Sequence, residues 1–311
     1  MGIAHLDDAP ARTYDLGHLR GRWTMLGDAA GSETVGVRRI QLPAGGWSTP
    51  VHDHGRAEEI FYVLAGTGVS WHNGQTAAVG AGDCILYLPR RGGHTLHSDE
   101  GLDVLAFGTR EFDEALALPR LGLSMAGRRG VESIPPPGDG TPLQHVREAE
   151  LGPPEMPATP GERPGTIVNV ADVPAERVER PRVARVRRNL GRAVGSRRAG
   201  LQHVTVDPGR YATPEHCHSL EEEIFVVLAG TGVLVLGEEE TPVGPGHVIA
   251  RPAGTGVAHA FRAETELELL AYGTRERNDI CFYPRSNKIA FWGVDVIARV
   301  ERISDYWDGE D

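Results

Sequence analysis

"HDHGRAEEIFYVLAGTG" spans residues 52–68, and "HCHSLEEEIFVVLAGTG" spans residues 216–232. Each stretch has two histidines two positions apart, then a glutamate five positions after the second histidine, and then an apolar run that ends in a glycine turn. In a β-strand, side chains at i and i+2 point to the same face of the sheet. The two histidines of each stretch are therefore predicted to lie side by side.

The two stretches belong to a longer internal repeat, which is the first feature to look for in a chain of this length. At an offset of 164 positions, the first histidine, the second histidine and the glutamate of one copy align with those of the other. Further on the offset is 165, where "VLAFGTRE" (104–111) aligns with "LLAYGTRE" (269–276). A repeat of this length with one net additional residue indicates two duplicated domains.

The apolar runs within each copy are short, and many of them alternate with polar residues. Glycine, proline or asparagine separates them at intervals of about ten residues, which is typical of an all-β sandwich or barrel. A short helix is the one exception we expect, within "DEALALPRLGLSMAGR" (113–128). We predict an N-terminal barrel at residues 1–125, a linker at 126–165, and a C-terminal barrel with a C-terminal extension at 166–311. Proline and glycine are expected to keep the linker out of both helices and sheets.

The composition is that of a soluble globular protein, with 40% hydrophobic residues, 24% charged residues and a mean hydropathy of -0.29. The net charge of -11 argues against binding to nucleic acid or to an anionic membrane. An arginine-rich segment at 177–198 is interpreted as solvated surface. Three cysteines without CxxC spacing, no signal peptide and no membrane-length apolar run favour a cytoplasmic protein. We expect a small-molecule ligand and a homodimer.

A further histidine follows about forty residues after the paired histidines of each stretch. Three neutral imidazoles and one carboxylate are a suitable ligand set for a borderline divalent ion. A divalent metal in each copy is therefore the hypothesis that the repeated pattern supports.

The pattern resembles the first motif of the cupin superfamily, G-x5-H-x-H-x3,4-E-x6-G. The glycine that closes this motif selects Glu59 and Glu223, because each lies seven positions before Gly66 or Gly230, whereas the adjacent glutamates do not. The second motif, G-x5-P-x-G-x2-H-x3-N, is matched less faithfully, and its terminal asparagine is absent from both copies. It indicates His94 and His259, which lie 165 positions apart, and His97 is the competing candidate in the first copy.

The resemblance implies two small jelly-roll β-barrels joined by the linker, with one metal site inside each. The implied ligands are His52, His54, Glu59 and His94 in the first barrel, and His216, His218, Glu223 and His259 in the second. Iron or manganese is favoured as the metal, with zinc, nickel, cobalt and copper as alternatives. Phe61, Val63, Phe225 and Val227 are expected to line the barrels, and Arg90, Arg91 and Arg251 are considered as contacts for an anionic substrate.

Cupins include decarboxylases, dioxygenases, isomerases, lyases and binding proteins, so the resemblance does not select one activity. We favour an enzyme, namely a metal-dependent oxidoreductase of dioxygenase type that acts on a small oxygen-rich molecule. The alternatives are a non-redox isomerase or lyase and a non-catalytic binding or sensor protein. The C-terminal site is weakly preferred as the catalytic one, because its second motif contains the longer loop "PAGTGVAH" (252–259).

Overall fold

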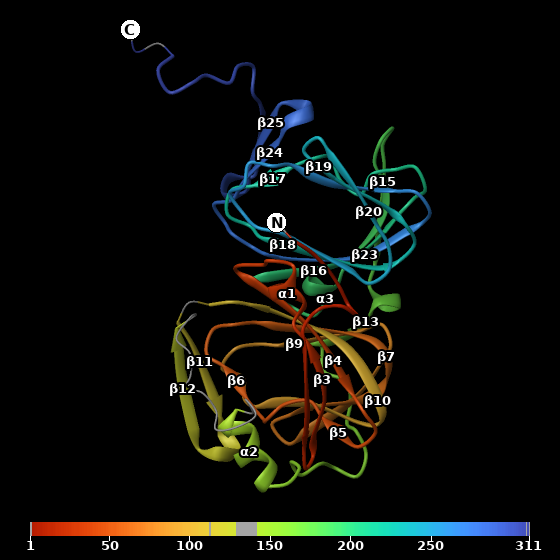
Figure 1. Cartoon of the computed structure of the whole chain (residues 1–311), viewed down its shortest axis with the longest axis vertical. Coiled ribbons are helices and arrows are strands. Elements are labelled where there is room, and N and C mark those ends of the chain that lie inside the picture. Colours follow the sequence, from red (N-terminus) through yellow and green to blue (C-terminus); the bar gives the residue numbers. More distant parts are fainter. Residues whose placement is uncertain (1, 112, 129–141, 309, 311) are drawn as a thin grey trace.

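A computed structural model of the chain describes residues 2–111, 113–128, 142–308 and 310. Two β-barrels lie end to end, with short helices between them (Figure 1). This is the predicted all-β architecture of two tandem jelly-roll barrels.

The first barrel is built from a large sheet in the order β13-β9-β7-β10-β4-β3-β2, with β5 and β8 joined to it, and a smaller sheet β12-β11-β6. Its strands are β2 (Ala11–Leu16), β3 (Leu19–Thr24), β4 (Val35–Leu42), β5 (Gly46–Trp47), β6 (Asp53–His54), β7 (Glu59–His72), β8 (Gln75–Gly80), β9 (Asp83–Tyr87), β10 (His94–Thr109), β11 (Asp113–Leu118), β12 (Leu123–Arg128) and β13 (Ile167–Asn169).

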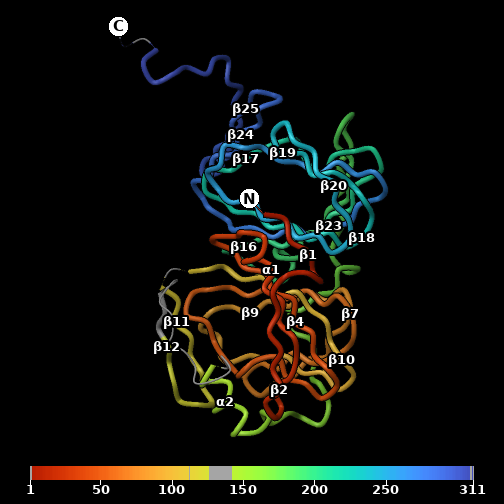
Figure 2. The backbone as a smooth tube through the Cα atoms, viewed as in Figure 1, coloured from red at the N-terminus to blue at the C-terminus, as the bar shows by residue number. Residues whose placement is uncertain are grey.

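The second barrel repeats this plan, with sheets in the orders β1-β21-β18-β23-β16-β15-β14, β17-β24-β25-β26 and β20-β19-β22. Its strands are β1 (Ile3–His5), β14 (Ala175–Glu179), β15 (Ala184–Asn189), β16 (Ala199–Val206), β17 (Cys217–His218), β18 (Glu223–Ala229), β19 (Gly232–Leu236), β20 (Glu239–Val243), β21 (His247–Arg251), β22 (His259–Ala263), β23 (Leu267–Thr274), β24 (Ile280–Tyr283), β25 (Lys288–Phe291) and β26 (Val296–Arg299). Beyond β26 the chain extends away from the barrel (Figures 1 and 2).

Two local predictions are corrected by the structure. Residues 113–128 form the hairpin β11–β12 around the 3-10 turn η1 (Pro119–Leu121) rather than an α-helix. The predicted linker contains the α-helix α2 (Leu143–Glu150), whose sequence LQHVREAE has neither proline nor glycine and so can form intrahelical hydrogen bonds. The other helical segments are α1 (Leu26–Ala29), α3 (Leu190–Ala193), η2 (Val170–Asp172), η3 (Pro284–Ser286) and η4 (Trp292–Val294).

Each half of the chain contributes one strand to the opposite barrel. Strand β1 pairs with β21, with Ile3 opposite Ile249, and β13 pairs with β9, with Ile167 opposite Ile85. These two pairs are related by the same 164-position offset as the histidine stretches, so the exchange is reciprocal. Residues 3–5 therefore pair within the second barrel and residues 167–169 within the first, across the boundaries predicted from the sequence.

The barrels share a buried apolar cluster formed by the outward faces of their large sheets. Phe107 of β10 stacks on Tyr272 of β23, with ring centroids 5.0 Å apart. Tyr62 and Val226, which the strand alternation places outside the barrels, are both buried in this cluster. Phe61 and Phe225, one position away, lie instead in the separate cores of the two barrels, as predicted.

Each barrel contains one buried glutamate that accepts hydrogen bonds from a loop of the opposite barrel. Glu58 accepts hydrogen bonds from the Ser196 hydroxyl and from the backbone N–H groups of residues 197 and 198. Glu222 accepts bonds from the Thr34 hydroxyl and from the N–H groups of residues 33–35. Glu58 directly precedes Glu59 and Glu222 directly precedes Glu223, so the start of each strand that carries a predicted ligand is held by the opposite barrel.

The glycine that closes the first motif is required by a close backbone approach. At Gly230, φ is +77°, and a Cβ atom would lie 1.8 Å from the carbonyl oxygen of Glu266. Gly209 is a matched control, since its φ is +73° but a Cβ atom added there would have no heavy atom within 4 Å.

We expect Gly209→Ala to cost about 1–2 kcal/mol of stability through backbone strain alone. Gly230→Ala should cost at least about twice as much, because the β18–β23 backbone must also move. Urea unfolding of both variants measures the difference, and equal free energies of unfolding would show that the close approach is unimportant.

Candidate metal centres

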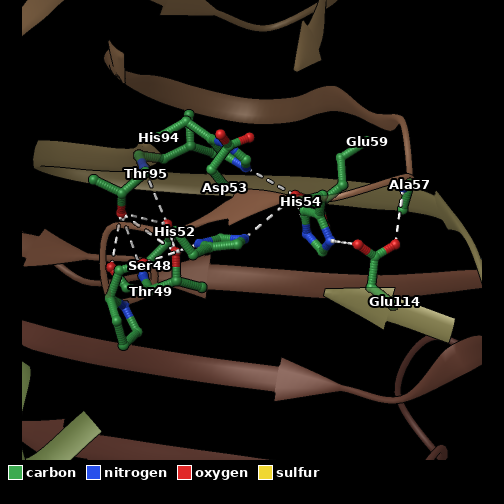
Figure 3. Close-up of polar contacts among 12 residues, drawn as sticks. Ser48, Thr49, His52, Asp53, His54, Ala57, Glu59, His94, Thr95 and Glu114 are labelled. Carbon is green, nitrogen blue, oxygen red and sulfur yellow. Dashed lines mark hydrogen bonds and ion pairs between the residues drawn. The ribbon is translucent and has the colours of Figure 1, made fainter. Parts of the chain in front are cut away.

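The first cluster of predicted ligands lies at the ends of three strands inside the first barrel (Figure 3). His52 and His94 form an antiparallel bridge that carries both side chains inward, and Glu59 is the first residue of β7. The Nε2 atoms of His52, His54 and His94 lie 3.4, 3.3 and 2.9 Å from Glu59 Oε2. The structure therefore brings all four predicted residues together around one carboxylate oxygen.

The second cluster has the same plan but is more open. His216 and His259 form the equivalent bridge, and the Nε2 atoms of His216, His218 and His259 lie 3.7, 3.6 and 3.0 Å from Glu223 Oε2. Ligand atoms of His216, Glu223 and His259 all lie within 4.8 Å of one another, as do those of all four residues in the first cluster. His218 is drawn towards Asp279, to which its Nδ1 donates at 2.6 Å.

His97, the competing candidate in the first copy, lies outside the first cluster. Its two ring nitrogens contact the carbonyl oxygen of Gly46 and the carboxylate of Asp99, and its ring stacks on Trp47. The strand register places His94 in the first cluster and His97 outside it, because His94 pairs with His52 whereas His97 pairs with Trp47.

Both clusters fit a divalent cation. His52 Nδ1 donates to the carbonyl oxygen of Pro50 at 2.9 Å, and His216 Nδ1 donates to that of Pro214 at 2.8 Å. In the neutral form this leaves an Nε2 lone pair facing a carboxylate oxygen, an arrangement that a divalent cation between them would stabilise. Two ligand atoms about 2.1 Å from one ion and at right angles are about 3 Å apart, close to the separations observed.

The protonation states in the clusters follow from burial and from neighbouring charges. Burial and the charge of His52 lower the pKa of His94 to about 3, and burial together with His259 lowers that of His216 to about 4. Burial alone would raise the pKa of Glu59 and of Glu223, but the facing imidazoles bring both well below the usual value. Neutral imidazole and ionised carboxylate are the forms that bind a metal.

A further carboxylate supports each cluster, and neither was singled out from the sequence. Asp279 accepts hydrogen bonds from His218 and from the N–H of Leu220, while Glu114 accepts from three N–H groups of the loop before β7 and lies 3.9 Å from His54 Nδ1. Carboxylates in this position orient metal-binding histidines. The internal repeat could have indicated both carboxylates, since Glu114 and Asp279 align at the 165-position offset.

The contact with Asp279 sets the charge of His218 in the metal-free protein. Burial would lower the pKa of His218, but the hydrogen bond to Asp279 and the charges of Glu223, Asp279 and Glu221 raise it to about 9. A cation that binds there must displace this proton, so its affinity should rise with pH.

We expect Asp279→Asn to lower the pKa of His218 from about 9 towards the usual 6.5, because the paired charge is removed while burial and the charges of Glu223 and Glu221 remain. A histidine whose pKa is raised on folding contributes stability below pH 6.5 that is lost as the pH rises through about 9, and the variant should lack this loss. NMR titration of the imidazole signals of metal-free protein measures the shift. An unchanged titration of His218 in the variant would contradict this role for Asp279.

The cavity beside the second cluster is larger than either of those beside the first. It measures about 420 Å³ and is lined by the cluster together with Arg185, Arg187, Glu221, Phe225, Tyr283 and Trp292. The first cluster adjoins two cavities of about 160 and 340 Å³, and the linker helix α2 contributes Gln144 and His145 to the wall of the latter. Helix α2 is held there by the ion pair between Glu148 and Arg120.

These cavities correct the assignment of the arginines. Arg185 and Arg187, in the segment interpreted as solvated surface, line the second cavity. Of the arginines considered for an anionic substrate, Arg90 and Arg91 are exposed, and Arg251 is buried and donates to the carbonyl oxygen of Val257. Arg185 and Arg187 both face the cavity because they lie two positions apart on β15, and side chains at that spacing point to the same side of a strand.

Two other groups at the second site were missed. Burial raises the pKa of Glu221 to about 7, and this carboxyl group lines the cavity. Cys281 lies with His216 and His218, and burial raises the pKa of its thiol to about 12, so it is neutral at physiological pH. Cys217, between two predicted ligands, is outside these groups of potential ligands, as alternation predicts.

Comparison with known proteins agrees with this architecture. The cupin domain family matches residues 38–107 and 202–272. An oxalate decarboxylase of Bacillus subtilis is 15% identical, with a TM-score of 0.56 over 88% of this chain and 76% of that one. An oxalate decarboxylase of Lactobacillus farciminis is 13% identical, with a TM-score of 0.57 over 88% of this chain and 86% of that one. A sugar phosphate isomerase of Silicibacter pomeroyi is 23% identical, with a TM-score of 0.40 over 45% of this chain and 97% of that one. A sequence comparison with curated proteins gives no match.

The fold and the two inward-facing histidine clusters define a tandem β-barrel protein with possible metal sites. Since a cupin domain is matched in each half, the chain is a bicupin. At these identities the oxalate decarboxylases show the fold alone, although the Bacillus subtilis protein contains Mn(II) centres. Within the described residues, the helices are too short or too polar to cross a lipid bilayer.

Proposed function

We propose that this bicupin is a metal-dependent enzyme whose reaction takes place in the C-terminal barrel, on a small oxygen-rich molecule. The observation that carries the proposal is the cavity of about 420 Å³ that adjoins His216, His218, Glu223 and His259, a volume within the usual range for small-molecule sites. The first cluster is more tightly drawn together, and helix α2 forms part of its cavity wall. The N-terminal site is accordingly proposed to bind a metal mainly for structural support.

An oxidoreductase of dioxygenase type is the first candidate. A divalent ion with four protein ligands keeps open positions for a substrate and a second reactant, and iron or manganese would supply redox chemistry there. The protein's own contribution is a partly apolar wall that includes Phe225, Phe261 and Leu269. This wall limits access of water to the reacting groups and strengthens electrostatic interactions within the cavity.

A non-redox isomerase or lyase is the second candidate, and Glu221 favours it. This carboxyl group lines the cavity, accepts a hydrogen bond from the N–H of Glu276, and has a pKa of about 7, where a general acid–base group works well. The first copy has Ala57 at the equivalent position, so the group is specific to the C-terminal site.

Oxygen consumption distinguishes the two candidates. We would load the purified chain with iron, manganese, zinc or nickel and mix it anaerobically with hydroxy acids, β-dicarbonyl compounds, catechols and enediols before admitting air. Uptake of O2 coupled to product formation supports the first candidate, and turnover under nitrogen supports the second. A chain that binds such compounds but never converts them would be a binding or sensor protein.

A further inference from the structure

The walls of the two cavities differ on one strand, although the barrels are repeats. At the 164-position offset, Arg185 and Arg187 of β15 replace Gly21 and Trp23 of β3. The register is the same in both barrels, since Trp23 pairs with Ile40 and Arg187 pairs with Val204 at the same offset. The first barrel therefore fills this wall with an indole ring, whereas the second places two guanidinium groups there.

Arg185 has a fixed position but unused hydrogen-bonding capacity. Its Nη1 donates to the carbonyl oxygen of Ala212 at 2.7 Å, which anchors the guanidinium to the loop that leads to His216. Its Nε is buried without an acceptor among the residues that the structure describes. A buried donor without a partner costs about 1–3 kcal/mol, so a ligand that provides an acceptor would be favoured.

The charge of Arg185 is not neutralised by an ion pair within the described part of the chain. Arg187, by contrast, pairs with the exposed Glu176. Burial and the neighbouring charge of Arg187 lower the pKa of Arg185, and the negative charges of Glu176 and, to a smaller extent, Glu223 oppose that shift. The cavity that Arg185 lines also contains the cluster residues His216 and Glu223. A guanidinium in this situation binds a carboxylate or phosphate through charge-assisted hydrogen bonds.

We infer that the C-terminal cavity binds a small oxyanion, with a carboxylate group held by Arg185 and the rest of the molecule directed towards the His216–Glu223 cluster. In the N-terminal cavity, glycine and tryptophan occupy the positions equivalent to Arg185 and Arg187, and the arginines that line it, Arg38 and Arg110, come from other positions. This inference rests on the proposed function for the location of the reaction, but it concerns binding and can be tested without turnover.

Calorimetric titration of the full-length, metal-free protein tests the inference, with malonate as a dicarboxylate, inorganic phosphate, and dimethyl malonate as the uncharged analogue. We expect malonate to bind, dimethyl malonate not to bind, and Arg185→Gln to lower the affinity for malonate at least tenfold. Arg180→Gln is the control, because this arginine is exposed and is not among the residues that line the cavity, and it should change the affinity less than threefold. Arg185→Lys, which keeps the charge without the planar fork, should restore part of the loss.

Malonate affinity that is equal in wild type and Arg185→Gln would overturn the inference, as would the absence of binding of either anion at millimolar concentration. Tighter binding of phosphate than malonate, with the same dependence on Arg185, would keep the oxyanion site and assign it to phosphate esters. If Arg185→Gln does not fold, a crystal of wild-type protein with malonate decides: density beside Arg185 supports the site, and density elsewhere overturns it. Turnover of an uncharged compound together with no anion binding would refute this inference alone and leave the proposed function standing.

Discussion

Replacing Glu222 with alanine is expected to destabilise the protein by about 3–5 kcal/mol, among the largest effects of any single substitution away from the metal clusters. The side chain is 1% exposed and accepts hydrogen bonds from Glu33 and Val35 N–H groups at 2.8 and 3.2 Å and from the Thr34 hydroxyl at 2.6 Å. Alanine would remove the acceptor of all these donors and leave the N–H of the buried Val35 without its partner, which costs more than the net contribution of that bond. Chemical denaturation monitored by circular dichroism measures the loss.

Two comparisons separate this effect from a general loss of charge. Glu58→Ala should cost a similar amount, because Glu58 is 2% exposed and holds the opposite loop in the same way. Glu239→Ala, at an exposed position on β20, should remain within about 0.5 kcal/mol of wild type. A Glu222→Ala variant as stable as Glu239→Ala would mean that the barrels do not depend on these contacts.

Substitution of one histidine in each cluster should separate the roles of the two sites. We expect His94→Ala and His259→Ala each to reduce bound metal from two ions to one per chain, because each removes a side chain that faces the cluster carboxylate at 2.9 or 3.0 Å. Only His259→Ala should lower the turnover rate, by on the order of 10³-fold or more. The loss should be this large because removing a residue that only orients a metal ligand already lowers metal affinity or activity about 10–100-fold. Metal analysis and initial rates on the same preparations provide both readings.

His97→Ala is the control for this pair, because His97 is equally buried but lies outside the cluster. It should retain two ions per chain and near-normal turnover. Loss of turnover in His94→Ala with full activity in His259→Ala would reverse the assignment of the reaction to the C-terminal barrel. Unchanged metal content in both variants would remove the basis for either site.

The repeat and the pattern of its apolar runs predict the all-β class and two duplicated domains, whereas the jelly-roll geometry and the full ligand sets are implied by the resemblance to cupins. His52 and His54 are two positions apart in a strand, and the register of the repeat pointed to His94 rather than His97. These are local or periodic properties, which a single sequence contains. The same periodicity placed Tyr62 and Val226 outside their barrels, where the structure buries them between the two.

Other features depend on which segments meet in space. The exchange of β1 and β13 was not predicted, because a three-residue strand carries too little pattern to indicate its partner. Arg185 was interpreted as solvated because a run of arginines looks like surface, and only the pairing of β15 with β16 shows which side chains turn inward. Asp279 was overlooked although its alignment with Glu114 was visible, since neither carboxylate belongs to the histidine stretches.

The function proposed for this bicupin depends on an ion at each cluster. X-ray diffraction from crystals of protein purified without chelators, collected on both sides of the absorption edge of the metal found by elemental analysis, tests this most directly. The account predicts two anomalous peaks per chain, one among His52, His54, Glu59 and His94 and one among His216, His218, Glu223 and His259. A map without a peak at either cluster, from protein grown with iron, manganese, zinc and nickel available, would contradict it.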